Sequence, residues 1–223
     1  MHIAGASGGF TDRVRAIAQL AKEPGVDAIV GDWLAENVMT VYGAGKAKQR
    51  KSPGEPTATD PLPLLEERKK SAQYASTFLQ CFEPAIPHLV KNKVKLAVNA
   101  GASDTQLLAE VCDQLVRDAG YEMKVAWVEG DDVTDVALEA FAKGEDFTST
   151  STGQKLRDWG HKPLCAQCYL GGWGIAEALR KGADIVICGR VSDAAPTIGV
   201  AAYVFLMPFD PTQVFVVLLD LNF

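Results

Sequence analysis

The chain has 223 residues, 48% hydrophobic and 22% charged, which is typical of a soluble globular protein. Its formal net charge of −6 argues against a nucleic-acid partner, because such partners attract basic surfaces. An odd number of cysteines, five, fits reduced thiols, and the first residues lack the pattern of a secretory signal, so we expect a cytoplasmic protein.

Strands and helices are predicted to alternate along the chain. Short apolar runs predict strands over residues 2–4, 26–30, 94–98, 123–128, 164–170 and 185–188. Helical spacing of apolar residues predicts helices over residues 13–22, 36–48, 74–90, 103–119, 136–141 and 174–181. Pro84 and Pro87 should bend or end the third helix, and Ser103 with Gln106 should form a capping box at the start of the fourth.

The stretch from Ala183 to Pro196 carries the strongest fold signal. Its apolar run Ile185–Cys188 suits a strand that is covered on both faces, as in a parallel sheet. Six alternations of strand, loop and helix imply right-handed crossovers. The sequence therefore predicts an α/β fold with a mostly parallel, doubly wound, Rossmann-like sheet.

One domain is expected over residues 1–202, with a surface excursion at residues 50–72 that contains four prolines. Residues 144–162 are polar and predict a loop or hairpin. Residues 203–223 form an apolar tail, interrupted by two prolines and an aspartate. Its runs are shorter than the roughly 20 residues of a membrane span, so we expect one further strand over Val214–Leu219 and no membrane partner.

Three local motifs invite interpretation, and the sequence disfavours each. Gly5–Gly9 matches the G-x-S-x-G of a hydrolase, but it follows the first strand and no histidine has a marked context. The same loop resembles a nicotinamide-binding turn with Asp32 at the ribose position, yet Thr11 stands where a third glycine is needed, so NAD(P) is disfavoured. Cys165 and Cys168 form a C-x-x-C that we expect inside a strand, where alternation separates the two sulfurs.

Polar residues recur where the predicted strands end, which is the edge that holds ligands in open α/β sheets. Candidate catalytic residues are Asp32, Glu129 and Arg190. Candidate ligand-binding residues are Gly5, Ser7, Gly8, Gly9, Asp12, Arg13, Glu36, Asn99, Gly101, Ser103, Asp131, Asp132, Tyr169 and Asp193.

The residue types indicate the chemistry expected at this edge. Arg13 and Arg190 suit a two-pronged clamp on a carboxylate or phosphate. Asp32 and Glu129 suit acid/base work or a divalent cation, although no dedicated metal site is predicted. For Ser103, Asp132 and Ser192, helix capping is the alternative role.

Five segments in this order resemble the acyclic terpene utilisation protein AtuA and its relatives: IAGASGGFTDR, VGDWLAE, VNAGAS, VEGDD and YLGGWGIAEALRKGADIVICGRVSDAAPTIG. The resemblance runs from about Ile3 to Ala202. It implies a role in the catabolism of acyclic terpenes such as citronellol and geraniol through branched acyl-CoA intermediates. The resemblance indicates a pathway but defines no chemical step.

The resemblance leaves several functions open. The leading expectation is an enzyme of branched acyl catabolism that binds a small anionic ligand, either a carboxylate or an acyl-CoA. The alternatives are a non-catalytic subunit or ligand-binding module, an inactive truncated product, and an NAD(P)-binding oxidoreductase. Relatives usually continue past residue 202, so the apolar tail predicts a truncated or divergent chain. The sequence leaves a homo-oligomer open.

Overall fold

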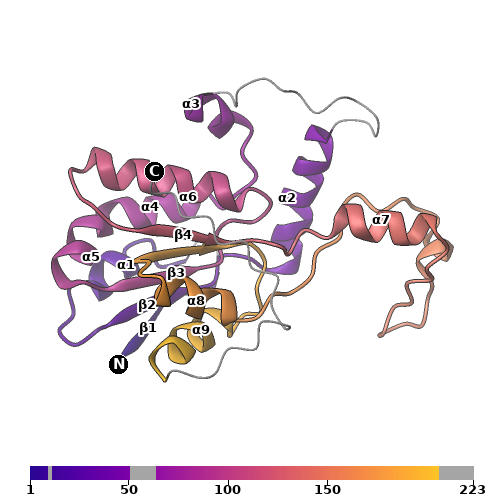
Figure 1. Ribbon diagram of the computed structural model, residues 1–223. Coiled ribbons are helices and arrows are strands. Elements are labelled where there is room, and N and C mark those ends of the chain that lie inside the picture. Colours follow the sequence, from indigo (N-terminus) through magenta and orange to yellow (C-terminus); the bar gives the residue numbers. More distant parts are fainter. Residues whose placement is uncertain (10–11, 51–63, 206–223) are drawn as a thin grey trace.

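A five-stranded parallel sheet forms the centre of the molecule, in a computed structural model that describes residues 1–9, 12–50 and 64–205 (Figure 1). The strand order is β1-β2-β3-β5-β4, and every neighbouring pair is parallel. The strands are β1 (Ile3–Ser7), β2 (Ala28–Gly31), β3 (Lys95–Val98), β4 (Val125–Val128) and β5 (Ile185–Cys188). This sheet confirms the predicted α/β class.

Helices cover both faces of the sheet, which is what makes the fold doubly wound (Figure 1). One face packs against α1 (Ala16–Leu20), α4 (Thr77–Phe82), α5 (Ile86–Asn92) and α6 (Thr105–Asp118). The other face packs against α8 (Trp173–Arg180) and α9 (Ala195–Val204). Alternate residues of each strand enter the two cores: Ile185 and Ile187 face the first, while Val186 and Cys188 face the second.

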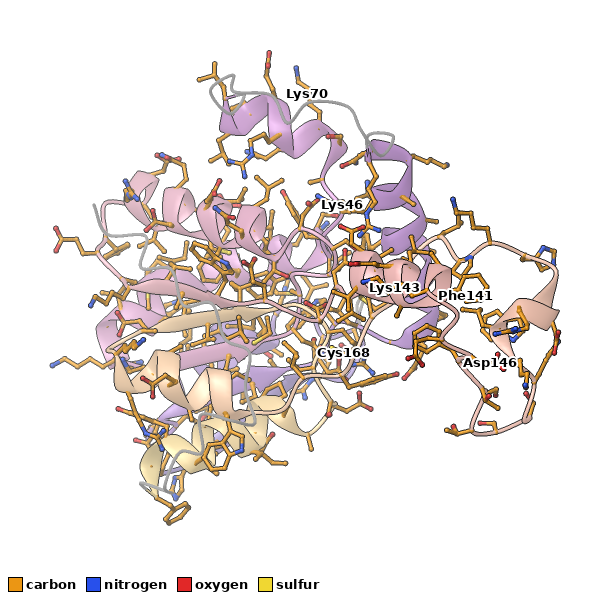
Figure 2. All side chains as sticks on the ribbon, turned by 45° about the vertical axis from the view of Figure 1, so that its right-hand side comes forward. Lys46, Lys70, Phe141, Lys143, Asp146 and Cys168 are labelled. Atoms are coloured by element: carbon orange, nitrogen blue, oxygen red, sulfur yellow. The ribbon has the colours of Figure 1, made fainter. Side chains whose placement is uncertain are left out.

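The remaining helical segments lie on the connections. They are α2 (Glu36–Gln49), α3 (Leu65–Arg68), α7 (Thr134–Ala142) and the 3-10 turns Lys69–Ser71, Glu83–Ala85 and Leu156–Trp159. Residues 133–166, here called the arm, carry α7 away from the sheet, and Phe141, Lys143 and Asp146 lie on it (Figure 2). A hydrogen bond of 3.0 Å from the Val133 N–H to the Ala166 carbonyl closes its base.

The connections reverse direction between β3 and β5. From β3 the chain crosses one face through α6 to reach β4, whereas after β5 it returns over the opposite face as α9, which contacts β2 and β3. Adjacent parallel strands whose connections leave in opposite directions form a crevice at their carboxyl ends. The polar residues after β2, β3 and β5 therefore meet around this crevice.

One predicted strand is wrong. Residues 164–170 make only isolated bridges, Asp132 to Gln167 and Leu170 to Val191, so they add no strand to the five that the described part of the chain contributes to the sheet. The segment, here called the crossing segment, instead runs across the carboxyl ends of the strands, where the Cys168 N–H donates to the Asp131 carbonyl and the Leu170 N–H donates to the Arg190 carbonyl. Cys165 and Cys168 therefore lie in a loop, as half-buried free thiols.

Two helix predictions meet different outcomes. The helix expected over residues 74–90 is broken into α4, a 3-10 turn and α5 at its prolines, as predicted. The capping box is wrong, because α6 begins at Thr105 and the Ser103 N–H donates instead to the Gln73 carbonyl at 2.9 Å.

Within the described ranges no helix has the length and apolarity that a membrane crossing requires. The strand expected over residues 214–219 lies outside the described residues.

Candidate functional site

A pocket of about 320 Å³ lies at the carboxyl ends of β1, β2 and β5, and we call it the strand-end pocket. Its polar lining comes from three segments that are far apart in the chain. The lining residues are Gly8, Gly9, Asp32, Trp33, Leu34, Ala35, Glu36, Asn37, Val38, Arg190 and Asp193. Six of the predicted site residues are among them, and they combine one cation with three carboxylates.

Arg190 is the buried cation of the strand-end pocket, with a side chain that is only 4% exposed. It follows β5 directly after Gly189, so the end of a fully buried strand fixes its position. Its Nη2 lies 3.2 Å from Glu36 Oε1 and 3.0 Å from Asp193 Oδ1, and Nη1 donates to the Val191 carbonyl at 2.9 Å. The buried Nε has no hydrogen-bond partner among the described residues.

Tyr169 joins Arg190 to Glu36. The Arg190 guanidinium carbon lies 4.4 Å from the centroid of the Tyr169 ring, and the Tyr169 hydroxyl donates to Glu36. That hydrogen bond, together with the positive charge of Arg190, lowers the pKa of Glu36. Glu36 and Asp193 are 74% and 76% exposed, so both carboxylates can rotate into solvent and release the guanidinium.

Asn99 clamps the ends of β2 and β3 together. Its amide is fully buried, accepts the Trp33 N–H at 2.6 Å and donates to Asp32 Oδ1 at 2.6 Å. The same Asp32 oxygen accepts the Leu34 N–H at 3.1 Å. Asn99 therefore positions the β2 turn, and one carboxylate oxygen of Asp32 is already committed to the backbone around it.

The glycine loop after β1 is held by its own side chains. The Ser7 oxygen lies 2.5 Å from both the Gly9 carbonyl and Asp12 Oδ1, so its single proton bonds within the loop, and these partners include no histidine. Arg13 adopts a left-handed backbone, with φ of 45°, and its guanidinium donates to the Gly5 carbonyl at 3.2 Å. The predicted clamp of Arg13 and Arg190 is therefore not formed, since Arg13 turns back onto its own loop.

Asp131 is a buried carboxylate behind Arg190. It is 3% exposed, and its Oδ2 accepts the Arg190 backbone N–H at 2.7 Å. Burial raises the pKa of Asp131 to about 6, although the Arg190 N–H partly offsets this effect. The side chain fills the space beside Gly189, where a Cβ would lie 2.2 Å from Asp131 Oδ1.

The comparison with family models identifies the family of this chain. A model described as the acyclic terpene utilisation family protein AtuA matches residues 1–206. The chain belongs to the AtuA family. The match includes all five strands and the whole strand-end pocket, so the pocket is part of the AtuA region of the chain. The comparisons with curated proteins and with solved structures return no match.

The AtuA chain separates its predicted catalytic residues. Asp32 and Arg190 line the strand-end pocket, whereas Glu129 lines a second pocket of about 390 Å³. That pocket is lined by Lys46, Gln49, Arg68, Ser71, Ser103, Asp104, Thr105, Gln106, Leu107 and Glu129. Asp32 and Glu129 thus face different pockets, and no group of three metal-ligating side chains occurs among the described residues.

Other predicted site residues have structural partners. Asp132 accepts the Thr134 N–H at 3.0 Å at the start of α7 and pairs with Arg50 at 2.7 Å. Ser192 does not cap α9, which begins at Ala195, and its hydroxyl oxygen lies 3.4 Å from the Leu170 carbonyl. A Cβ on Gly101 would lie 2.7 Å from the Cys188 carbonyl, so this glycine allows the loop after β3 to approach β5.

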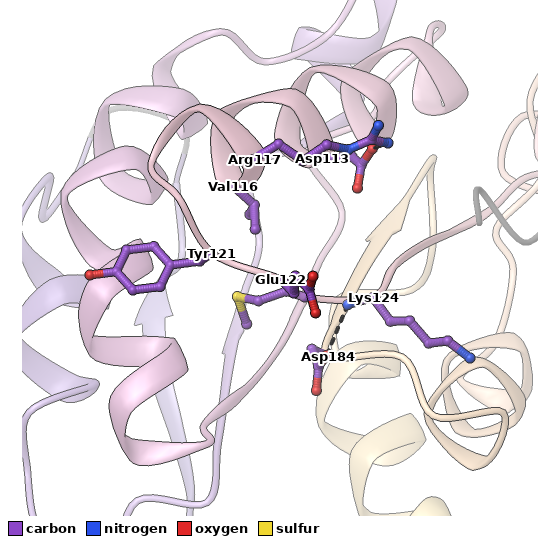
Figure 3. A pocket seen from close by; sticks show the side chains of 8 residues that line it. Asp113, Val116, Arg117, Tyr121, Glu122, Lys124 and Asp184 are labelled. Atoms are coloured by element: carbon purple, nitrogen blue, oxygen red, sulfur yellow. Dashed lines mark hydrogen bonds and ion pairs between the residues drawn. The ribbon is translucent and has the colours of Figure 1, made fainter. Parts of the chain in front are cut away.

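Two further pockets of the AtuA chain contain none of the predicted residues. The larger, about 560 Å³, lies at the opposite edge of the sheet, where Asp184 accepts the Lys124 N–H at 2.9 Å (Figure 3). The other, about 370 Å³, has a largely apolar lining on the arm that includes Leu138, Phe147 and Trp159.

Some lining residues were not predicted from the sequence. Trp33, Leu34 and Val38 line the strand-end pocket beside Asp32 and Glu36, which were predicted. The available signal was their position, because Trp33 and Leu34 follow Asp32 in the short connection between β2 and α2, and Val38 lies beside Glu36 in the first turn of α2. Apolar neighbours of this kind carry no charge or hydrogen-bonding group that marks them in the sequence.

Proposed function

We propose that this AtuA-family chain binds the carboxylate of a small branched acid in the strand-end pocket, with Arg190 as the anchoring cation. The observation that carries the proposal is the guanidinium of Arg190, which is buried, lines the pocket and retains an unpartnered Nε. Buried polar groups are normally paired, so this N–H favours a ligand at the site. The two exposed carboxylates beside it are replaceable partners.

The size and lining of the pocket favour a small acid. A volume of about 320 Å³ is at the lower end of ordinary small-molecule sites. Leu34 and Val38 offer apolar surface for a branched chain, while Arg190 binds the head group. Of the two ligand classes expected, the free carboxylate fits within the pocket, and the nucleotide part of an acyl-CoA would extend outside it.

The family supports a role in acyclic terpene utilisation, and within it we propose the catabolism of citronellol- and geraniol-derived acids. Asp32 is the proposed acid/base group, because its carboxylate lines the same pocket as Arg190. Binding without catalysis is the second candidate, and it is favoured by the hydrogen bonds that Asp32 already makes to the Leu34 N–H and to Asn99.

Calorimetric titration with the carboxylic acids of citronellol and geraniol tests the binding. We expect saturation in the unaltered chain and a loss of about 10- to 100-fold in affinity for Arg190→Ala, because a charge-assisted contact is removed. Arg157→Ala, on the arm, is the matched control and should bind normally. Equal affinity in both variants would refute the anchoring role of Arg190, and we expect no saturable binding of NAD or NADP.

Catalysis is tested separately with CoA thioesters of the same acids. If the chain is an enzyme, Asp32→Asn should abolish turnover and retain binding. If the unaltered chain binds the acid and turns over none of the thioesters, the ligand-binding candidate is correct for this chain.

A further inference from the structure

We infer that Asp131 positions Arg190 for the bound anion and couples anion binding to the uptake of a proton. This inference rests on the proposed function, because the anion is the ligand of the strand-end pocket. Asp131 follows β4, whereas Arg190 follows β5, the neighbouring strand. The two residues therefore connect adjacent strand ends behind the pocket.

The first observation is the fit of the Asp131 side chain against the β5 turn. Its Oδ2 accepts the Arg190 N–H at 2.7 Å, and its Oδ1 occupies the space beside Gly189. Because Asp131 is short and buried, it cannot swing away without leaving the Arg190 N–H unpaired. The carboxylate therefore sets the direction in which the Arg190 side chain leaves the backbone.

The second observation is that the backbone of Asp131 holds the segment that carries Tyr169. The Asp131 carbonyl accepts the Cys168 N–H at 2.8 Å, and the next residue is the tyrosine that stacks on Arg190. The Leu170 N–H in turn donates to the Arg190 carbonyl at 3.2 Å. Asp131 thus fixes both partners of the stacked pair. The Asp131 side chain holds Arg190, and the Asp131 main chain holds the segment that carries the Tyr169 ring.

The charges around Asp131 make its protonation sensitive to a bound anion. Asp132 and Glu129, on the same segment, are negative neighbours that add to the effect of burial and favour the neutral form of Asp131. An anion on the Arg190 guanidinium adds another negative charge nearby. Coupling between two sites is reciprocal. A proton on Asp131 therefore raises the affinity for the anion, and a bound anion raises the affinity of Asp131 for the proton.

The other groups that face Asp131 do not titrate in the same range. Cys188 lies on β5 and Cys168 on the crossing segment, and burial raises the pKa of both thiols. Both therefore stay protonated near pH 6, and Arg190 stays charged. A proton taken up on anion binding in this range is assigned to Asp131.

The positioning role can be tested without a ligand by recording amide nitrogen spectra of the chain from pH 4.5 to pH 8. The Arg190 amide signal should shift with a midpoint near pH 6 in the unaltered protein and with a lower midpoint in Asp132→Asn, which removes a negative neighbour, and it should lose that midpoint in Asp131→Asn. A flat Arg190 signal in the unaltered protein would overturn the inference, even if Asp131→Asn fails to fold.

The coupling is tested with octyl sulfonate, an anion that remains ionised across this range. Its affinity for the unaltered chain should fall about tenfold from pH 5 to pH 8, whereas the profile should be flat in Asp131→Asn and should fall at lower pH in Asp132→Asn, which lacks a negative neighbour of Asp131. Binding with the same pH profile in all three proteins would overturn the inference and leave the proposed function standing. Failure of both the sulfonate and the terpenoid acids to bind at any pH would refute the proposed function itself.

Discussion

The guanidinium carbon of Arg190 lies 4.4 Å from the centroid of the Tyr169 ring. These residues come from two different segments at the carboxyl edge of the sheet, the crossing segment 164–170 and the turn after β5. The ring covers one face of the cation and leaves the edge that carries its N–H groups for carboxylates. Tyr169 therefore orients the group on which the proposed ligand depends.

Replacing Tyr169 tests this orientation. Tyr169→Leu should weaken binding of the terpenoid acid about twofold to fivefold, because a half-exposed cation–π contact contributes about 0.5–1 kcal/mol. Tyr169→Phe keeps the stacked ring and should lose less affinity. Calorimetric titration of both variants gives the comparison, and equal losses would show that the hydroxyl, and not the ring, is the important group.

Removing the carboxylate that competes for Arg190 should strengthen anion binding. Glu36→Gln should raise affinity for the acid about twofold to fivefold, the range expected when an exposed ion pair no longer has to be broken. Glu139→Gln, whose partner Lys143 is on the arm, is the control and should bind normally. A loss of affinity for the acid in Glu36→Gln would show that Glu36 supports anion binding and does not compete for Arg190.

The raised pKa of Asp131 predicts how stability depends on pH. Between pH 3.8, the ordinary value, and about 6, the folded carboxyl holds a proton that the unfolded one has released. Stability conferred by this group is therefore lost as pH rises, by up to about 3 kcal/mol above pH 6. Asp131→Asn lacks this loss. In urea unfolding at pH 4, 6 and 8, the unfolding free energy of the variant should therefore rise relative to that of the unaltered chain as the pH increases. A constant difference across the three pH values would contradict the raised pKa.

Gly189 should not tolerate a side chain. In Gly189→Ala the new Cβ would lie 2.2 Å from the buried Asp131 carboxylate, and relieving that overlap should cost about 1–3 kcal/mol of unfolding free energy. Gly171→Ala is the matched control, because its Cβ would meet no atom within 4 Å. Thermal unfolding distinguishes them, and equal melting temperatures would show that the turn after β5 can relax.

Asn99 should contribute to stability through the β2 turn. Asn99→Ala leaves the buried Trp33 N–H without its acceptor and should cost about 2–4 kcal/mol. Asn37→Ala removes an exposed amide from the same region and should change stability by less than about 0.5 kcal/mol. Urea unfolding measures both, and a small effect at Asn99 would mean that the two strand ends do not need the clamp.

The sheet could be predicted because each strand is a short apolar run that requires cover on both faces. Ile185–Cys188 is completely buried for this reason. The crossing segment 164–170 stays outside the sheet although its apolar run predicts a strand, because an apolar run does not show which backbone groups it will pair with, and this one bonds to Asp131 and Arg190 at the turns after β4 and β5. Its site residue, Tyr169, is nevertheless predicted, because it lies near the carboxyl end of that run, shortly before Gly171 and Gly172.

The candidate site could be predicted only as far as the sheet edge. Arg190 and Asp32 reach a common pocket because their strands end there, whereas Glu129 ends its strand facing another pocket. Asp131 and Asp132 form a pair in which one points inward and the other outward, as consecutive residues of an extended chain must. The sequence does not show which of the two aspartates points inward. It also does not show that Arg190 Nε lacks a partner among the described residues, because that depends on side-chain packing.

The position of β5 between β3 and β4 affects how the chain is synthesised. Among the described strands β4 pairs only with β5, so a ribosome-bound chain that has not yet released residues 185–188 leaves β4 without a neighbour and β3 with an open side. Unpaired strand edges are templates for aggregation, so this interval in translation is when a chaperone would protect the chain most. Of the described strands, the last to emerge is β5, which joins β3 to β4 and also delivers Arg190, so the pocket forms only after β5 has paired.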